Sequence, residues 1–300
     1  MRTGKEVADG VFHVRTLIAN VYIVRSSGSW MLVDAGLHGY AETIRSTARH
    51  FVGPLAPAAI VLTHGHFDHV GSLEALLDSW PSPVVAHRLE RPYLSGHSSY
   101  PPPDPLVGRG SMALLSRLYP RGPVDVSSRL ELLPSDGSVP GAPEWRWIHT
   151  PGHTAGHVSL FRERDRTLIA GDAVVTTKQE SLMAVATQRQ ELHGPPAYFT
   201  QDWQSAGDSV GRLAALEPEV LATGHGEPLS GPDMRGDLRA LAARFEQLEV
   251  PTFGRYAQVP AVANEYGVVR LPPDPLPKVV AGAAAAAAVA WTLARRRRAG

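Results

Sequence analysis

Short apolar runs rich in β-branched residues recur along the chain and predict short buried strands. In order, these predicted strands cover 11–15, 21–25, 30–33, 60–63, 84–86, 145–149, 157–161, 167–170 and 220–223. Segments with apolar residues three or four positions apart predict helices over 41–50, 72–79, 200–216 and 234–248. Because strands and helices occur in both halves, the pattern favours two sheets covered by helices over separate all-α and all-β domains.

Residues 88–126 interrupt this alternation. The stretch "YLSGHSSYPPPDPLVGRG" is dense in Pro, Gly and Ser, and the "SMALLSRLY" that follows it predicts a short amphipathic helix. A long irregular segment inside a compact domain is usually a lid, a binding loop or a disordered stretch. Since this one carries aromatic residues such as Tyr93, Tyr100 and Tyr119, we expect it to pack, and we interpret it as an inserted lid.

The C-terminal part of the chain differs in composition from the rest. We predict a catalytic domain over 1–260, a Pro-rich linker over 261–278 and an Ala-rich helix with an Arg-rich end over 279–298. The apolar run "VVAGAAAAAAVAWTLA" would form a helix about 24 Å long, shorter than the hydrocarbon core of about 30 Å. Two interpretations stay open for 279–298: weak membrane association, or a protruding helix that contacts a partner.

Composition narrows the class of protein. The chain of 300 residues has 29 Lys and Arg against 29 Asp and Glu, so its charge does not favour nucleic acid, and we expect no such partner. The absence of Cys excludes structural disulfides, a thiolate nucleophile and Cys-ligated zinc. The N-terminal "MRTGKEVADG" lacks the apolar region of a secretory signal, which predicts a cytoplasmic protein. Nothing in the sequence indicates the oligomeric state.

Histidine and aspartate residues gather just behind several predicted strands. These candidate metal ligands are His64, His66, Asp68, His69, His153, Asp172 and His225. Strand ends in neighbouring sheets can converge on one edge, and imidazole and carboxylate are ligands that Zn²⁺ takes readily. Seven groups are too many for one tetrahedral ion but enough for two ions that share a carboxylate.

Five short motifs resemble those of the metallo-β-lactamase superfamily, in the same order along the chain. In chain order they are "VDAG" at 33–36, "THGHFDH" at 63–69, "PGHT" at 151–154, "AGD" at 170–172 and "TGHG" at 223–226. The resemblance spans roughly 7–230 and is specific, since all five motifs agree. It implies an α/β fold of four layers, an αββα sandwich, with the site at one edge of the two sheets.

The resemblance also implies a role for each candidate ligand. His64, His66 and His153 would hold one metal, and Asp68, His69 and His225 would hold a second. Asp172 would bridge the two ions, and Asp34 would brace the histidine loop by hydrogen bonds.

The implied activity is that of a dinuclear metal-dependent hydrolase with two divalent ions, which we expect to be Zn, with Mn or Fe as alternatives. A metal-bridging hydroxide would attack an ester-like bond in a lactone, a thioester or a related small molecule, as in lactonases and glyoxalase II. Asp68 would orient the nucleophile and pass a proton to the leaving group. The chain looks like a member of an uncharacterised hydrolase subgroup of the superfamily.

Two other functions of the same fold stay open. One is a redox enzyme of the diiron or persulfide dioxygenase type, although diiron relatives carry a Glu where this chain has Gly65. The other is a metal-binding member without catalysis.

Some residues near the motifs have a second interpretation. We expect His157 to begin a strand outside the metal shell, and His149 either to be packed or to support a ligand without binding the metal itself. The aromatic residues Tyr198, Phe199 and Trp203 would either line the substrate cleft or form the core of the helix that follows.

Overall fold

The computed structural model describes residues 4–108, 110–279 and 281. The predicted helix at 279–298 therefore lies almost entirely outside the described residues. Within the described part of the chain, no helix is both long enough and apolar enough to cross a bilayer.

The first sheet contains seven strands in chain order. They are β1 (Gly4–Ala8), β2 (Val11–Thr16), β3 (Ala19–Ser26), β4 (Ser29–Val33), β5 (Ala59–Val61), β6 (Val84–Ala86) and β7 (Leu130–Leu132). The strands from β1 to β4 pair antiparallel through short turns, and those from β4 to β7 pair parallel. Parallel pairing needs crossover connections, which here contain α1 (Ala41–Val52), α2 (Phe67–Val70) and α3 (Leu73–Leu77).

The second sheet has five strands in the order β12-β11-β10-β9-β8. Their bounds are β8 (Trp145–His149), β9 (Val158–Arg162), β10 (Thr167–Gly171), β11 (Val220–Thr223) and β12 (Leu229–Ser230). Strands β10 and β11 are parallel, and the connection between them contains α6 (Leu182–Thr187), the 3₁₀ turn η2 (Ala197–Phe199) and α7 (Trp203–Ala215).

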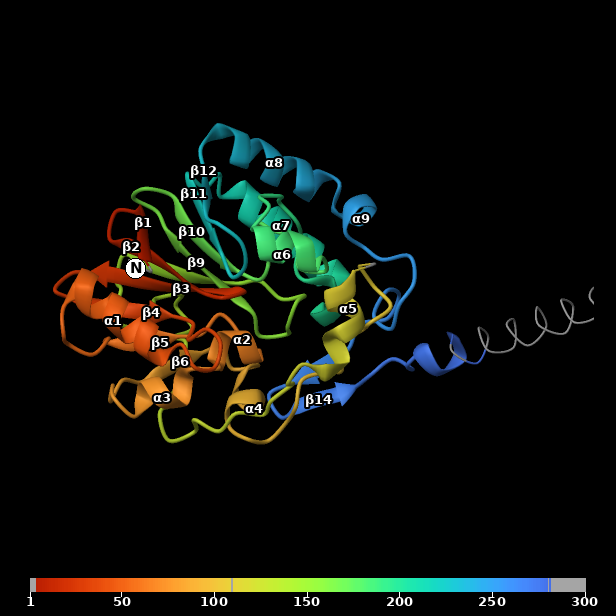
Figure 1. Cartoon of the computed structure of the whole chain (residues 1–300), viewed down its shortest axis with the longest axis horizontal. Coiled ribbons are helices and arrows are strands. Elements are labelled where there is room, and N and C mark those ends of the chain that lie inside the picture. The colour runs from red at the N-terminus through yellow and green to blue at the C-terminus, as the bar shows by residue number, and fades with distance from the viewer. Residues whose placement is uncertain (1–3, 109, 280, 282–300) are drawn as a thin grey trace, which may run out of the picture.

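Three apolar clusters hold four layers together. Met31, Val61 and Leu160 belong to a cluster between the two sheets. The outer face of the first sheet packs on α1, which buries Ile44 and Ala48 one turn apart. The outer face of the second sheet packs on α7 and α8 (Pro232–Ala243). Figure 1 shows the two sheets between these helices, with α1 and α3 on one side and α7 and α8 on the other. The predicted αββα sandwich is therefore confirmed.

Most predicted elements occur with small shifts at their ends, but several short ones were missed. In the two large sheets, the missed strands are β1, β7 and β12, which are short or lie at sheet edges. The predicted helix over 234–248 is divided at Arg244 into α8 and α9 (Phe245–Leu248).

The predicted Pro-rich linker at 261–278 contains a hairpin, which corrects that description for part of the segment. Here β13 (Val262–Asn264) pairs antiparallel with β14 (Gly267–Arg270). The hairpin contacts the 88–126 segment: the Val268 N–H donates a hydrogen bond to Ser98 Oγ at 3.4 Å. Because this hairpin contacts the catalytic domain through Ser98, this part of the segment is an ordered structural element and not only a linker.

The 88–126 segment packs closely at its start. It forms α4 (Arg91–Leu94), α5 (Ser111–Leu115) and the 3₁₀ turn η1 (Ser116–Leu118). Tyr93, Leu94 and Tyr100 are buried, whereas Leu114 on α5 is 70% exposed. The first part of this segment therefore belongs to the core, and a lid movement stays a prediction for the part around α5.

Candidate metal centre

The structure brings all seven candidate ligands to one edge of the two sheets. His64, His66, Asp68 and His69 follow β5, and α2 begins within this stretch with His66 at its N-cap. The other three follow β8, β10 and β11 of the second sheet. Their ligand atoms form three overlapping groups within 4.8 Å: His64, His66 and His153; His64, His69 and Asp172; Asp68, His69 and His225.

In the first group, three imidazole nitrogens face one another. His66 Nδ1 lies 3.0 Å from His64 Nε2 and 2.9 Å from His153 Nε2. Burial lowers the pKa of His64 and His66 well below the ordinary value and that of His153 to about 4, so these rings are neutral at pH 7. Nitrogens bound to one tetrahedral ion at 2.0–2.1 Å would lie about 3.3 Å apart. The spacing is close to that of a tridentate site.

Asp172 lies between this group and the remaining ligands. Its Oδ2 is 3.0 Å from His225 Nε2 and 3.4 Å from His153 Nε2, whereas its Oδ1 is 3.4 Å from His69 Nε2. Burial raises the pKa of Asp172, but His225 and His69 outweigh it and lower that pKa well below the ordinary value. Asp172 is therefore ionised at neutral pH, with both oxygens directed at imidazoles.

Several buried polar atoms of the cluster fit a bound cation. Asp172 Oδ1 and His69 Nε2 lie 3.4 Å apart without forming a hydrogen bond, and both are buried without a hydrogen-bond partner elsewhere in the described structure, which is costly unless a cation occupies the site. Gly224 makes room for them, because a Cβ there would overlap Asp172 Oδ1 and lie 2.8 Å from His69 Cε1. Nitrogen and carboxylate oxygen donors without sulfur suit divalent cations such as Zn²⁺, Mn²⁺ or Fe²⁺.

Asp34 holds the ligand loop by hydrogen bonds, as predicted. It lies after β4 with a φ of 62°, and its Oδ1 accepts from the Thr63 N–H at 2.8 Å. Its Oδ2 accepts from Thr63 Oγ1 and lies 2.8 Å from His69 Nδ1. The carboxylate therefore directs His69 Nε2 toward Asp172.

His157 and His149 lie outside the three groups, in agreement with their predicted roles. His157 Nε2 accepts from the backbone N–H of Asp172 at 2.9 Å, so Nδ1 carries the proton and donates to the Thr150 carbonyl at 3.1 Å. His149 stacks on His87 with ring centroids 4.3 Å apart. His157 supports a ligand through its backbone, and His149 is a packing residue.

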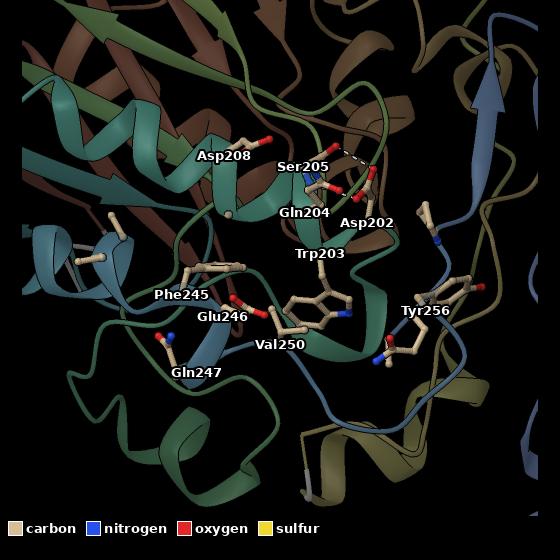
Figure 2. Close-up of a pocket in the computed structure, with 16 residues that line it drawn as sticks. Asp202, Trp203, Gln204, Ser205, Asp208, Phe245, Glu246, Gln247, Val250 and Tyr256 are labelled. Carbon is tan, nitrogen blue, oxygen red and sulfur yellow. Dashed lines mark hydrogen bonds between the residues drawn. The ribbon is translucent and has the colours of Figure 1, made fainter.

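The three aromatic candidates divide between the site and the core. Phe199 stacks on His66 with centroids 4.5 Å apart, and Tyr198 is buried beside it. Trp203 instead packs with Phe245 under the second sheet. Figure 2 shows Trp203 and Phe245 among the residues that line a pocket. This pocket has a volume of about 750 Å³, and none of the seven candidate ligands lines it. Only the first two aromatic residues therefore adjoin the candidate metal centre.

Sequence reasoning missed one group beside the site, the buried carboxylate of Glu90. This residue follows β6, and β6 is the parallel neighbour of the strand that leads into His64. Its oxygens accept hydrogen bonds from Gly65, Tyr100, Thr154 and Gly156. An acidic residue just after the neighbouring parallel strand could have indicated a group near the site. It was overlooked because "HRLERP" resembles an ordinary polar turn.

Known proteins share this fold and sequence pattern. The chain is 49% identical to the probable metallo-hydrolase YflN of Bacillus subtilis over 249 residues, which cover 82% of this chain and 94% of that protein. The crystal structure of the BLEG-1 B3 metallo-beta-lactamase has a TM-score of 0.51 and 26% identity, covering 72% of this chain and 90% of that one. A metallo-beta-lactamase family protein of Thermus thermophilus has a TM-score of 0.53 and 20% identity, covering 80% and 81%, and supports the fold alone.

The family model described as the metallo-beta-lactamase superfamily matches residues 14–225, a span that contains all seven candidate ligands. The chain therefore belongs to the metallo-beta-lactamase superfamily and is a metal-dependent hydrolase of that superfamily.

Proposed function

We propose that the protein is a dinuclear hydrolase that cleaves an ester-like bond in a small molecule such as a lactone or a thioester. His64, His66 and His153 would hold one ion, and Asp68, His69 and His225 would hold the other. Zn²⁺ is the ion we expect, with Mn or Fe as alternatives. The observation that carries the proposal is the position of Asp172, whose two oxygens face histidines of both groups.

When bound, ions in such a site polarise a carbonyl and lower the pKa of water to about 7. The chain itself supplies the proton carrier. Asp68 is the most exposed of the seven ligands, at 7%, and its Oδ2 lies 3.4 Å from His225 Nε2. A carboxylate at the open side of the cluster can accept a proton from the nucleophile and return it to the leaving group. We therefore assign Asp68 both a ligand role and a catalytic role.

The surroundings of His66 support a substrate with an apolar part. Phe199 stacks on this ring, and Phe67 and Tyr119 pack against the same apolar cluster. An apolar wall with a few convergent polar groups is typical of small-molecule sites. An acyl chain or another apolar part of an ester would fit such a wall better than a highly charged group would.

Elemental analysis and a substrate screen test this function together. Protein reconstituted with Zn²⁺ should hold close to two equivalents and hydrolyse a lactone or a thioester faster than a phosphodiester or a β-lactam. Less than half an equivalent of metal would contradict the dinuclear centre. Iron-coloured protein that consumes O₂ without hydrolysing any of these substrates would contradict hydrolysis and favour the redox alternative.

A further inference from the structure

A single buried side chain joins the two loops that supply the first group of histidines. Glu90 is fully buried at the start of α4. Its Oε2 accepts from the Gly65 N–H at 3.0 Å and from the Tyr100 hydroxyl. Its Oε1 accepts from Thr154 Oγ1 at 2.7 Å and from the Gly156 N–H at 3.0 Å. A buried carboxylate is costly unless it is well hydrogen-bonded, and here both oxygens are fully engaged.

The partners of Glu90 include residues that lie immediately beside metal-ligand candidates. Gly65 separates His64 from His66, and Thr154 follows His153 directly. The two loops come from different sheets, and His66 and His153 are 87 positions apart in the chain. Among the described strands, none of the first sheet pairs with one of the second, so the spacing of the three nitrogens depends on groups that reach across.

The glycines in these loops allow the close approach that such a bridge needs. A Cβ on Gly156 would lie 2.7 Å from Glu90 Oε1, and a Cβ on Gly65 would lie 2.7 Å from the Tyr100 hydroxyl oxygen. At these two positions, therefore, only backbone atoms without a side chain fit against Glu90 and Tyr100.

Tyr100 extends the same connection to a ligand ring. Its hydroxyl lies 2.8 Å from Gly65 N as an acceptor while it donates to Glu90. Its ring contacts His66 with centroids 4.5 Å apart, on a ring that also stacks on Phe199. The orientation of His66 is therefore tied to the carboxylate through Tyr100.

We propose that Glu90 is a positioning residue that fixes the distance between the His64–His66 loop and His153 and thereby sets the metal affinity of that site. The inference rests on the metal centre proposed above. Groups that orient metal ligands in this way typically change metal affinity about 10–100-fold when they are removed. Glu90 would act through hydrogen bonds alone, without touching the ion or the substrate.

The test is the Zn²⁺ affinity of Glu90→Gln, measured by competition with a chelator, together with the melting temperature of the metal-free protein. An amide nitrogen in place of either carboxylate oxygen would face a backbone N–H, from Gly65 or from Gly156, so the bridge cannot be kept on both sides. We expect Zn²⁺ to bind at least about 10-fold more weakly than in the wild type.

Asp165→Asn is the matched control. Asp165 accepts two hydrogen bonds from the buried Arg162, at 3.0 and 2.6 Å, in the turn between β9 and β10. That turn is at the opposite end of these strands from Asp172. The control should lower the melting temperature, because the buried Arg162 guanidinium loses its ionised partner. It should leave Zn²⁺ affinity within about twofold of the wild type, because the substitution lies far from the candidate ligands.

The outcomes separate positioning from general stability. A Glu90→Gln variant that melts earlier but binds Zn²⁺ as tightly as the wild type would overturn the inference alone. Absence of Zn²⁺ binding in the wild type would overturn the proposed metal centre together with it. If Glu90→Gln does not fold, Tyr100→Phe keeps the carboxylate and the ring on His66 but removes the hydroxyl. Weaker Zn²⁺ binding in Tyr100→Phe supports the bridge, and unchanged binding overturns it.

Discussion

The two sheets contribute to the candidate metal centre in different ways. The first sheet provides four candidate ligands from one continuous stretch, 64–69, in which the chain turns from β5 into α2. The second sheet provides three candidate ligands from three separate strand ends, at His153, Asp172 and His225. The backbone N–H and C=O groups of a continuous loop need hydrogen-bond partners outside regular secondary structure. A residue at the end of a strand is instead positioned by the sheet hydrogen bonds of that strand.

The groups that support these candidate ligands by hydrogen bonds also differ between the loop and the strand ends. Buried carboxylates hold the loop: Asp34 accepts from Thr63 and contacts His69, and Glu90 accepts from Gly65. Neutral groups hold two of the three strand ends, those at Asp172 and His225, whereas the third, beside His153, shares the Glu90 carboxylate with the loop. The backbone N–H of Asp172 donates to the His157 ring, and His225 Nδ1 lies 2.7 Å from the Ile18 carbonyl. Hydrogen bonds to ionised groups are stronger than neutral ones, so the loop should be more sensitive to loss of a support than the strand ends at Asp172 and His225.

The largest effect should follow from removing Asp172, the candidate ligand whose oxygens face histidines of both proposed metal sites. Asp172→Ala takes away the oxygens that face His69, His153 and His225, so both metal occupancies should fall. We expect the rate of hydrolysis to fall by about 10³-fold or more, at the upper end of what one electrostatic group contributes in a closed site. Elemental analysis and kinetics measure both effects. A variant that keeps two equivalents of metal would show that Asp172 does not bridge the groups.

A substitution at Asp68 tests the proposed catalytic role separately from metal binding. Asp68→Asn keeps the shape and one oxygen donor but removes the charge and the basic site. The ion held by His64, His66 and His153 should stay bound, and kcat should fall by about 10²-fold, in the range of a lost general acid–base group. Kinetics at saturating metal separate this loss from weaker binding at the second site. Near-wild-type kcat with both metals present would leave Asp68 as a ligand only.

Asp34 tests the carboxylate support of the loop. In Asp34→Asn an amide nitrogen would face either Thr63 or His69, both of which act as donors to Asp34. We expect the metal held with His69 to bind about 10-fold more weakly, while the ion at His153 is less affected. Stepwise chelator titration followed by elemental analysis resolves the two sites. Equal loss at both sites would contradict a support specific to the loop.

The sequence predicts most of the fold and of the candidate site, but not the groups whose roles depend on contacts between distant segments. Short apolar runs located β4, β5 and β10, because buried strands leave a strong local pattern. The seven candidate ligands could be located because motif residues lie at the ends of those runs. Glu90 was missed because its role depends on three-dimensional contacts with residues such as Thr154, 64 positions away, which no local pattern records. The hairpin at 262–270 was missed because its strands are short and, apart from Gly267, exposed or only partly buried.

The smallest effect on metal content should come from His157, the neutral support of a strand end. His157→Ala removes the acceptor of the buried Asp172 N–H, which should lower the free energy of unfolding by about 1–3 kcal/mol. Both metal occupancies should nevertheless stay nearly unchanged, because the ladder between β10 and β11 still places Asp172. His157→Gln is the matched variant, since its side-chain oxygen can accept the same N–H and should recover part of the lost stability. Thermal melting and elemental analysis on the same samples give the answer. If His157→Ala loses as much metal as Asp34→Asn, strand ends depend on their supports as strongly as the loop does, and the contrast between the two sheets is wrong.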